Sequence, residues 1–318
     1  MTAGTRSLVV VLAVIGLLFA LIFATHPWLA RSVVTFAFAG QVIRIAVPYA
    51  LAALGGSITE RAGVIDLALE AKLLFGAFAA AAFAYATGNL YVGIAGGMLA
   101  GVAVAAVQLA CALGWRADQV IVGIALNVLA LGGTRFLLQL LYGQGSNSPV
   151  GGPAFGDAML TNPLVWLAIV APVVVALALV RTRWGLRLRA AGDRPDALVS
   201  VGVSPARART WAALVGGALA GAGGAQLSLS VGVFSADMSG GRGYFALAMV
   251  IIAGWRPHFG ALACIGIATA SALDTQLQLA GSWIPRDLIP ILPHVLVLVV
   301  LAVTGRSSRP PPRSLGRI

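Results

Sequence analysis

The stretch TERAGVIDLALEAK (residues 59–72) concentrates charge in a chain that is otherwise strongly apolar: it holds Glu60, Arg61, Asp66, Glu70 and Lys72. Only 10% of the 318 residues are charged and 59% are hydrophobic. Soluble domains use about 45–50% apolar residues, and apolar runs of about 17–25 residues can cross a bilayer as helices. Because long apolar runs flank the charged stretch, we expect an all-α, polytopic transmembrane helical bundle.

The apolar runs predict about ten membrane spans and leave no room for a sizeable soluble domain, so residues 1–318 are expected to form a single transmembrane domain. The first run could also be a signal peptide, but a retained span is preferred because no small-residue cleavage site is clear. The segment 231–254 suggests a re-entrant stretch followed by a half-length helix. Candidate spans lie near residues 8–24, 33–56, 73–88, 90–113, 120–142, 163–180, 211–230, 244–254, 259–280 and 288–304.

Arginine is concentrated in residues 181–210 and again in the tail, residues 305–318. Since short cytoplasmic loops collect Lys and Arg, both segments are expected in the cytoplasm, with the last four predicted spans between them. Continuing the alternation places the amino terminus and residues 57–72 in the cytoplasm and residues 143–162 outside. The net charge of +11 is therefore interpreted as membrane topology, and nucleic-acid binding would be a poor explanation because no basic domain exists to carry it.

The charged stretch predicts a break in a helix at the cytoplasmic end of a span. Gly55 and Gly56 are expected to let the backbone break, and Thr59 is expected to cap a new helix over residues 62–75. In addition, spans 2–5 and 7–10 are hypothesised to be related as an inverted repeat, which the Gly-rich openings AALGG and GALAGAGG favour weakly.

On such a helix Asp66 and Glu70 are four residues apart and share a face, where like charges repel. The structural interpretation is that they pair with Arg61, Lys72 or Arg44. The functional interpretation is that the broken helix lines the translocation path or contacts the ATPase side, as discontinuous helices do in transporters.

Polar residues within other spans are further candidates for the path, because an amide that faced lipid would leave its donors unsatisfied. Asn127 and Gln226 stand out because small residues surround each of them. Hydrogen bonding between helices is the alternative for each residue. The candidate path residues are therefore Asn127, Gln226, Asp66 and Glu70.

The segment AAGDRPDALVSVGVSPARA (residues 190–208) lies inside the arginine-rich loop 181–210. It predicts a short helix with Asp193 as a cap, Pro195 near the first turn and an apolar face over residues 197–201. A short helix with an apolar stripe between arginines is typical of a docking surface. The alternative is an ordinary charged loop near the lipid headgroups.

Four stretches resemble the permease subunits of ATP-binding-cassette (ABC) importers in the branched-chain amino acid, ribose and nucleoside superfamily, and are most similar to the nucleoside type. LRAAGDRPDALVSVGV (188–203) resembles the coupling helix that docks in the ATPase. The other stretches are PYALAALGGSITERAGVIDLALEAKLLFGAF (48–78), ADQVIVGIALNVLALGGTRFL (117–137) and GRGYFALAMVIIAGWRPHFGALA (241–263). The chain departs from the family pattern twice. The pattern usually has Asn-Leu-Gly at residues 66–68 and Gly-Met at residues 71–72.

The resemblance implies a permease subunit that translocates a nucleoside or a related small molecule. Ribose-like sugars, branched-chain amino acids or a vitamin are alternative substrates. The implied location is a bacterial cytoplasmic (inner) membrane, with both termini in the cytoplasm. An ion-coupled secondary transporter that uses Asp66, Glu70 and Asp274 is a second alternative, and a membrane-embedded enzyme is a weaker one because no catalytic constellation is found.

No P-loop is present, so the chain is expected not to be an enzyme and to carry no cofactor; ATP would be hydrolysed on a separate ATPase subunit. The resemblance also implies a second homologous permease subunit and an extracytoplasmic substrate-binding lipoprotein. The residues expected to couple the chain to the ATPase are Gly192, Asp193, Pro195, Asp196, Ala197 and Gly202.

Overall fold

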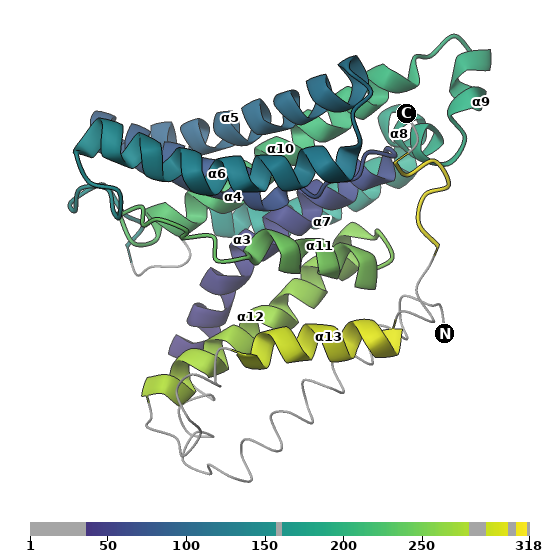
Figure 1. The fold of residues 1–318 in the computed structure, drawn as a ribbon. Helices are drawn as coiled ribbons and strands as arrows, with labels where there is room; N and C mark the ends of the chain where they lie inside the picture. Colours follow the sequence, from purple (N-terminus) through teal and green to yellow (C-terminus); the bar gives the residue numbers. More distant parts are fainter. Residues whose placement is uncertain (1–35, 157–160, 280–290, 305–309, 317–318) are drawn as a thin grey trace.

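The computed structural model describes residues 36–156, 161–279, 291–304 and 310–316. In these ranges the chain is helical apart from its connections and an isolated antiparallel bridge between Asn147 and Ser235 (Figure 1). The elements are α3 (Phe36–Arg61), α4 (Leu69–Thr87), α5 (Leu90–Leu109), the π-helix η1 (Ala110–Gly114), α6 (Gln119–Tyr142), α7 (Pro163–Arg181), α8 (Arg183–Asp193), α9 (Pro195–Ser200), α10 (Pro205–Leu229), α11 (Arg242–Ile252), α12 (Pro257–Leu279) and α13 (Leu292–Thr304).

The helices confirm the predicted polytopic bundle. Seven of the described helices are long and apolar enough to cross a membrane: α3, α4, α5 with η1, α6, α7, α10 and α12. The predicted half-length helix is also confirmed, because α11 has 11 residues and is about 16 Å long at 1.5 Å per residue. The predicted span at 8–24 lies outside the described residues, and each of the others corresponds to a helix. The inverted repeat stays a prediction.

Helix α10 is the centre of the bundle, where it packs against α3, α4 and α5 (Figure 1). In an apolar stretch of 18 residues in α10, 78% of the residues are buried, whereas in the corresponding stretch of α7 only 22% are buried. Glycines make this packing close: a Cβ atom at Gly221 would lie 2.2 Å from the carbonyl oxygen of Gly97, and one at Gly224 would lie 2.1 Å from that of Leu73. Small residues allow helix backbones to approach in this way in membrane proteins.

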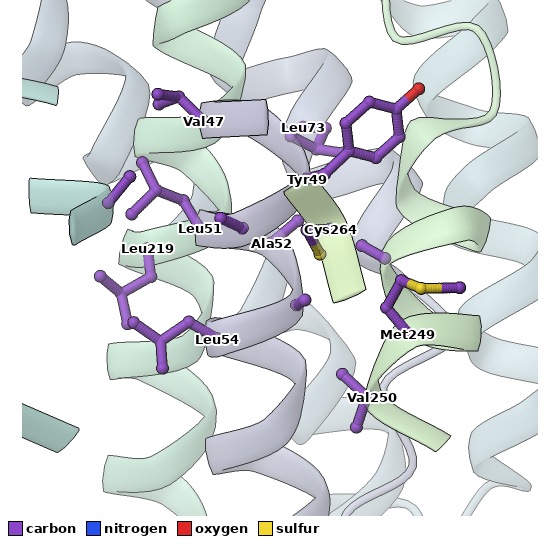
Figure 2. Close-up of a cluster of buried hydrophobic side chains, with 14 of the residues drawn as sticks. Val47, Tyr49, Leu51, Ala52, Leu54, Leu73, Leu219, Met249, Val250 and Cys264 are labelled. Carbon is purple, nitrogen blue, oxygen red and sulfur yellow. The ribbon is translucent and has the colours of Figure 1, made fainter. Parts of the chain in front are cut away.

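The main apolar cluster surrounds α3. Figure 2 shows Leu51 and Leu54 of α3 beside Leu219 of α10, with Met249 of α11 and Cys264 of α12 on the other side. Leu51 and Cys264 are fully buried. Helix α3 is therefore fixed on both sides by packing, so its end is held at a defined place.

The predicted break in the charged stretch exists, but its predicted position was wrong. Helix α3 continues through Gly55 and Gly56 to Arg61, and the next helix begins at Leu69 rather than at residue 62. Gly55 serves for close packing, because a Cβ atom there would lie 2.3 Å from the carbonyl oxygen of Gly216. Thr59 caps no new helix: its hydroxyl donates to the Gly55 carbonyl oxygen within α3 (3.1 Å).

The arginine-rich loop contains two helices. The short helix predicted there is confirmed as α9, but Asp193 is not its cap, because Asp193 is the last residue of α8 and α9 has no side-chain cap. Helix α8 was not predicted. It begins where the Thr182 hydroxyl accepts a hydrogen bond from the Gly185 N–H (3.0 Å), and its buried face includes Leu188 and Ala191.

Candidate translocation and coupling sites

The break between α3 and α4 is stabilised by amide side chains from α5 and α6. The Ile65 N–H donates to Oε1 of Gln119 (2.7 Å), and Nε2 of Gln108 donates to the Ile65 carbonyl oxygen (2.9 Å). Gln108 and Gln119 are both buried. Irregular backbone at membrane depth is tolerated only where protein groups or water satisfy it. The two glutamines supply such partners for both backbone polar groups of Ile65.

Asn127 of α6 performs the same task at the end of the break. Its Oδ1 accepts from the Ala71 N–H (3.0 Å), and its Nδ2 donates to the Leu67 carbonyl oxygen (2.8 Å) and to the Tyr244 hydroxyl (3.1 Å). Every polar atom of the Asn127 side chain thus has a protein partner. The alternative of hydrogen bonding between helices accounts for this residue, and its role in the translocation path stays a prediction.

Asp66 lies in the break and forms an ion pair with Lys72 of α4. The prediction that Asp66 and Glu70 share a helix face was therefore wrong, because only Glu70 is on a helix. Compensation of the carboxylate by Lys72, one of the three predicted partners, is confirmed. Both side chains are fully buried, and Oδ2 of Asp66 has no hydrogen-bond partner among the described residues.

Glu70, in the first turn of α4, binds the beginning of α11. Its Oε1 accepts from the Gly241 N–H (2.8 Å) and its Oε2 accepts from the Gly243 N–H (2.6 Å). A carboxylate at the beginning of a helix is favourable because it satisfies unpaired N–H groups and complements the helix dipole. Glu70 therefore holds in place the backbone on both sides of Arg242.

Gln226 lies apart from these residues, in a polar cavity of about 420 Å³. Its Oε1 accepts from Nδ2 of Asn162 (2.8 Å), and its buried Nε2 has no hydrogen-bond partner among the described residues. The cavity connects to the helix break through α11, because Glu70 anchors the residues that flank Arg242. The cavity is lined by Gln41, Arg44, Ile45, Pro48, Gln226, Leu227, Ser230, Val231, Ser235, Met238 and Arg242.

The predicted coupling residues gather at the other end of α10. Gly192, the residue before Asp193 in α8, is buried against the end of α3, where a Cβ atom would lie 2.1 Å from the Arg61 carbonyl oxygen. Gly202 adopts a positive φ of 73° in the turn after α9. Asp193, Pro195, Asp196 and Ala197 line a groove of about 610 Å³ together with Arg194, Pro205, Arg209, Arg313 and Ser314.

Arg209 joins this groove to the helix break. Its Nε donates to the Ala62 carbonyl oxygen (3.3 Å) and its Nη2 donates to the Ala191 carbonyl oxygen (3.3 Å). Arg209 and Gln226 are 17 residues apart on α10, which corresponds to about 25 Å along the helix axis. The groove and the cavity are therefore at opposite ends of the central helix.

Sequence reasoning missed the roles of Arg209 and Trp255. Nε1 of Trp255 donates to Oε2 of Glu60 (2.6 Å), and Nε of Arg61 donates to the Trp255 carbonyl oxygen (2.8 Å). A tryptophan two residues before a proline, between α11 and α12, was a usable signal, but its partners Glu60 and Arg61 are far away in the sequence. Among the described residues, no group of three His, Cys, Asp or Glu side chains is placed to hold a metal ion.

The sequence of the chain is similar to those of known transport proteins. Residues 38–303 match the protein family described as "Branched-chain amino acid transport system / permease component". The chain is 28% identical over 291 residues to the guanosine ABC transporter permease protein NupQ of Bacillus subtilis. The aligned region covers 82% of this chain and 88% of NupQ.

Two further relatives cover most of the chain. The putative glucose ABC transporter permease protein TsgC13 of Haloferax volcanii is 34% identical over 261 residues, with 73% of this chain and 78% of that protein covered. The nucleoside ABC transporter permease protein NupC of Lactococcus lactis is 30% identical over 280 residues, with 80% of this chain and 88% of that protein covered. No solved structure gives a significant match.

Proposed function

Since the chain belongs to the family of branched-chain amino acid transport system permease components and is the permease subunit of an ABC importer, we propose that it translocates a nucleoside or a related ribosyl or heterocyclic small molecule. Two of the relatives named above are permeases for guanosine and for nucleosides. The third, a putative glucose permease, keeps ribose-like and other sugars as the second candidate class. Family membership argues against the ion-coupled alternative.

The polar cavity around Gln226 is the observation that supports a substrate site. Its volume of about 420 Å³ is in the range of small-molecule sites, about 300–1,000 Å³. Gln41, Gln226, Ser230 and Ser235 offer both donors and acceptors, which suit sugar hydroxyls and the carbonyl and amino groups of a base. Arg242 adds a cationic donor for carbonyl oxygens. We therefore assign Gln226 to substrate binding, with Glu70 and Asn127 positioning the walls of the path and Asp66 holding the break.

Replacing Gln226 by Leu is expected to lower guanosine uptake about tenfold, because the cavity loses one of its two amide side chains and the Asn162 amide loses its acceptor. Uptake of labelled guanosine would be measured in cells that express the complete importer, with unlabelled glucose and leucine as competitors and an ATPase-dead partner as a control. Gln278→Leu, which changes an exposed glutamine on α12, should keep full uptake. If the wild-type importer takes up no more guanosine with the working ATPase than with the ATPase-dead partner, the nucleoside assignment is wrong.

The proposed partners are a separate ATPase subunit, a second homologous permease subunit and an extracytoplasmic binding lipoprotein. In this proposal the importer lies in a bacterial cytoplasmic membrane and both chain termini are in the cytoplasm. ATP would be hydrolysed on the partner, and the ATPase would dock on α8 and α9. The groove beside α9 supports this docking, because Asp193, Asp196 and Ala197 are all exposed there.

Replacing Asp193 and Asp196 together by Arg is expected to lower the guanosine taken up per ATP hydrolysed about tenfold. Both carboxylates are exposed, so the reversal of charge should leave membrane insertion and folding intact. The ratio would be measured in proteoliposomes that contain the complete importer. The matched control, Asp193→Glu with Asp196→Glu, keeps the charges and should keep the ratio. An unchanged ratio in the arginine variant would show that this surface does not couple the subunits.

A further inference from the structure

The segment Arg313–Gly316, here called the docked segment, returns to the end of α8 (Figure 1). The Ser314 N–H donates to the Gly192 carbonyl oxygen (2.8 Å), and the Ser314 hydroxyl lies within hydrogen-bond distance of the carbonyl oxygens of Gly192 (2.6 Å) and Ala191 (3.0 Å). Ser314 is only 6% exposed. The family match ends at residue 303, so these contacts lie beyond the part of the chain that the family describes.

The docked segment also contacts the break between α3 and α4. The Gly316 N–H donates to the Gly63 carbonyl oxygen (3.0 Å). Gly316 has a φ of +76°, and a Cβ atom there would lie 2.8 Å from Cδ1 of Ile65. The φ favours glycine, because other residues rarely adopt it. A side chain here would also have to displace the end of the Ile65 side chain. One short segment thus binds the end of α8 on one side and the break on the other.

Arg209 and Ser314 donate hydrogen bonds to carbonyl oxygens at the end of α8 and just after the end of α3. The acceptors are the carbonyl oxygens of Ala191 and Gly192 at the end of α8 and of Ala62 after α3. Such groups at the end of a helix have no partner within the helix and need one from elsewhere. Nη2 of Arg209 lies 3.5 Å from the Ser314 hydroxyl, so the docked segment completes the same polar connection. Arg313 and Ser314 also form part of the wall of the groove beside α9.

We propose that the docked segment is a positioning element for energy coupling: it holds the end of α8 on the helix break, so that a displacement of α9 by the ATPase reaches the break. From the break the displacement passes to α4 and, through Glu70, to the backbone beside Arg242 in the polar cavity. This inference rests on the proposed docking of the ATPase on α8 and α9. It does not depend on the identity of the substrate.

The test measures ATP hydrolysis by the complete importer in proteoliposomes, with and without its binding protein. Gly316→Val is expected to lower the stimulation of hydrolysis by the binding protein about tenfold while basal hydrolysis and assembly are kept. Ser314→Ala, which removes only the hydroxyl, is expected to lower the stimulation about fivefold. Pro311→Ala, at an exposed position outside the groove, is the matched control and should keep full stimulation. A purely structural role would lower basal and stimulated hydrolysis together.

The outcomes separate this inference from the proposed function. If Gly316→Val and Ser314→Ala keep full stimulation while the Asp193→Arg, Asp196→Arg variant loses it, the ATPase docks as proposed but the docked segment has no part in coupling. If all three variants keep full stimulation, the docking surface is wrong as well. If Gly316→Val does not assemble, Ser314→Ala decides, and full stimulation in that variant overturns the inference.

Discussion

Replacing Lys72 by Met alone is expected to destabilise the folded chain by about 3–5 kcal/mol, because it leaves the Asp66 carboxylate buried without its partner. Both side chains of this pair are fully buried. Asp66→Asn alone should cost a similar amount, since it leaves the Lys72 ammonium group buried and unpaired. The midpoint of thermal unfolding of the purified protein in detergent would report both losses.

The double replacement, Asp66→Asn with Lys72→Met, is expected to recover most of the stability lost in either single variant. Two neutral side chains remove the desolvation cost of the pair, and replacing a buried ion pair by neutral residues is often close to neutral in free energy. Asn and Met are also the residues that the family pattern usually has at these two positions. The two departures from the pattern would then be one compensated change.

A double-mutant cycle over these variants isolates the interaction between the two residues. Arg183→Met, at an exposed position on α8, is the control for the loss of a cation and should leave the unfolding midpoint unchanged. Effects that simply add, with the double variant less stable than either single one, would show that the pair does not compensate.

The order of the helices could be predicted from the sequence because membrane thickness sets the length of an apolar run. The exact place of the break could not. A glycine in a helix allows either a turn or a close approach of two backbones, and the sequence does not say which. Gly55 and Gly56 were assigned to a turn, whereas Gly55 packs against Gly216, which is 161 residues away in the sequence.

The candidate site could be predicted only in part, because it too depends on contacts between residues that are far apart in the sequence. Asp66, Glu70 and Asn127 are brought together at the break, and charge alone indicated that the carboxylates need partners. The partners of Glu70 are backbone N–H groups of residues 241 and 243, which no pattern of side chains reveals. Helix α8 was missed because its arginines were interpreted as marking a cytoplasmic loop. Its buried face depends on contacts with other elements, which the sequence does not reveal.

Gly192→Val is expected to lower the guanosine taken up per ATP hydrolysed roughly a hundredfold, near the upper end of coupling effects. A Cβ atom at Gly192 would lie 2.1 Å from the Arg61 carbonyl oxygen and 3.3 Å from the Gly63 nitrogen. These atoms are backbone, so they cannot move aside as the end of a flexible side chain could. The end of α8 must therefore separate from the break. The carbonyl oxygen of residue Gly192 would also move away from Ser314.

The effect should exceed that of the Asp193→Arg, Asp196→Arg variant, because the charge reversal changes the docking surface whereas Gly192→Val disconnects that surface from the bundle. Membrane insertion should persist, since Gly192 lies outside the long helices that span the membrane. Gly132→Val places the same side chain on α6 where no atom lies within 4 Å, and it should keep the wild-type ratio. A wild-type ratio in Gly192→Val would mean that the end of α8 can leave the break without consequence, and that coupling follows another route.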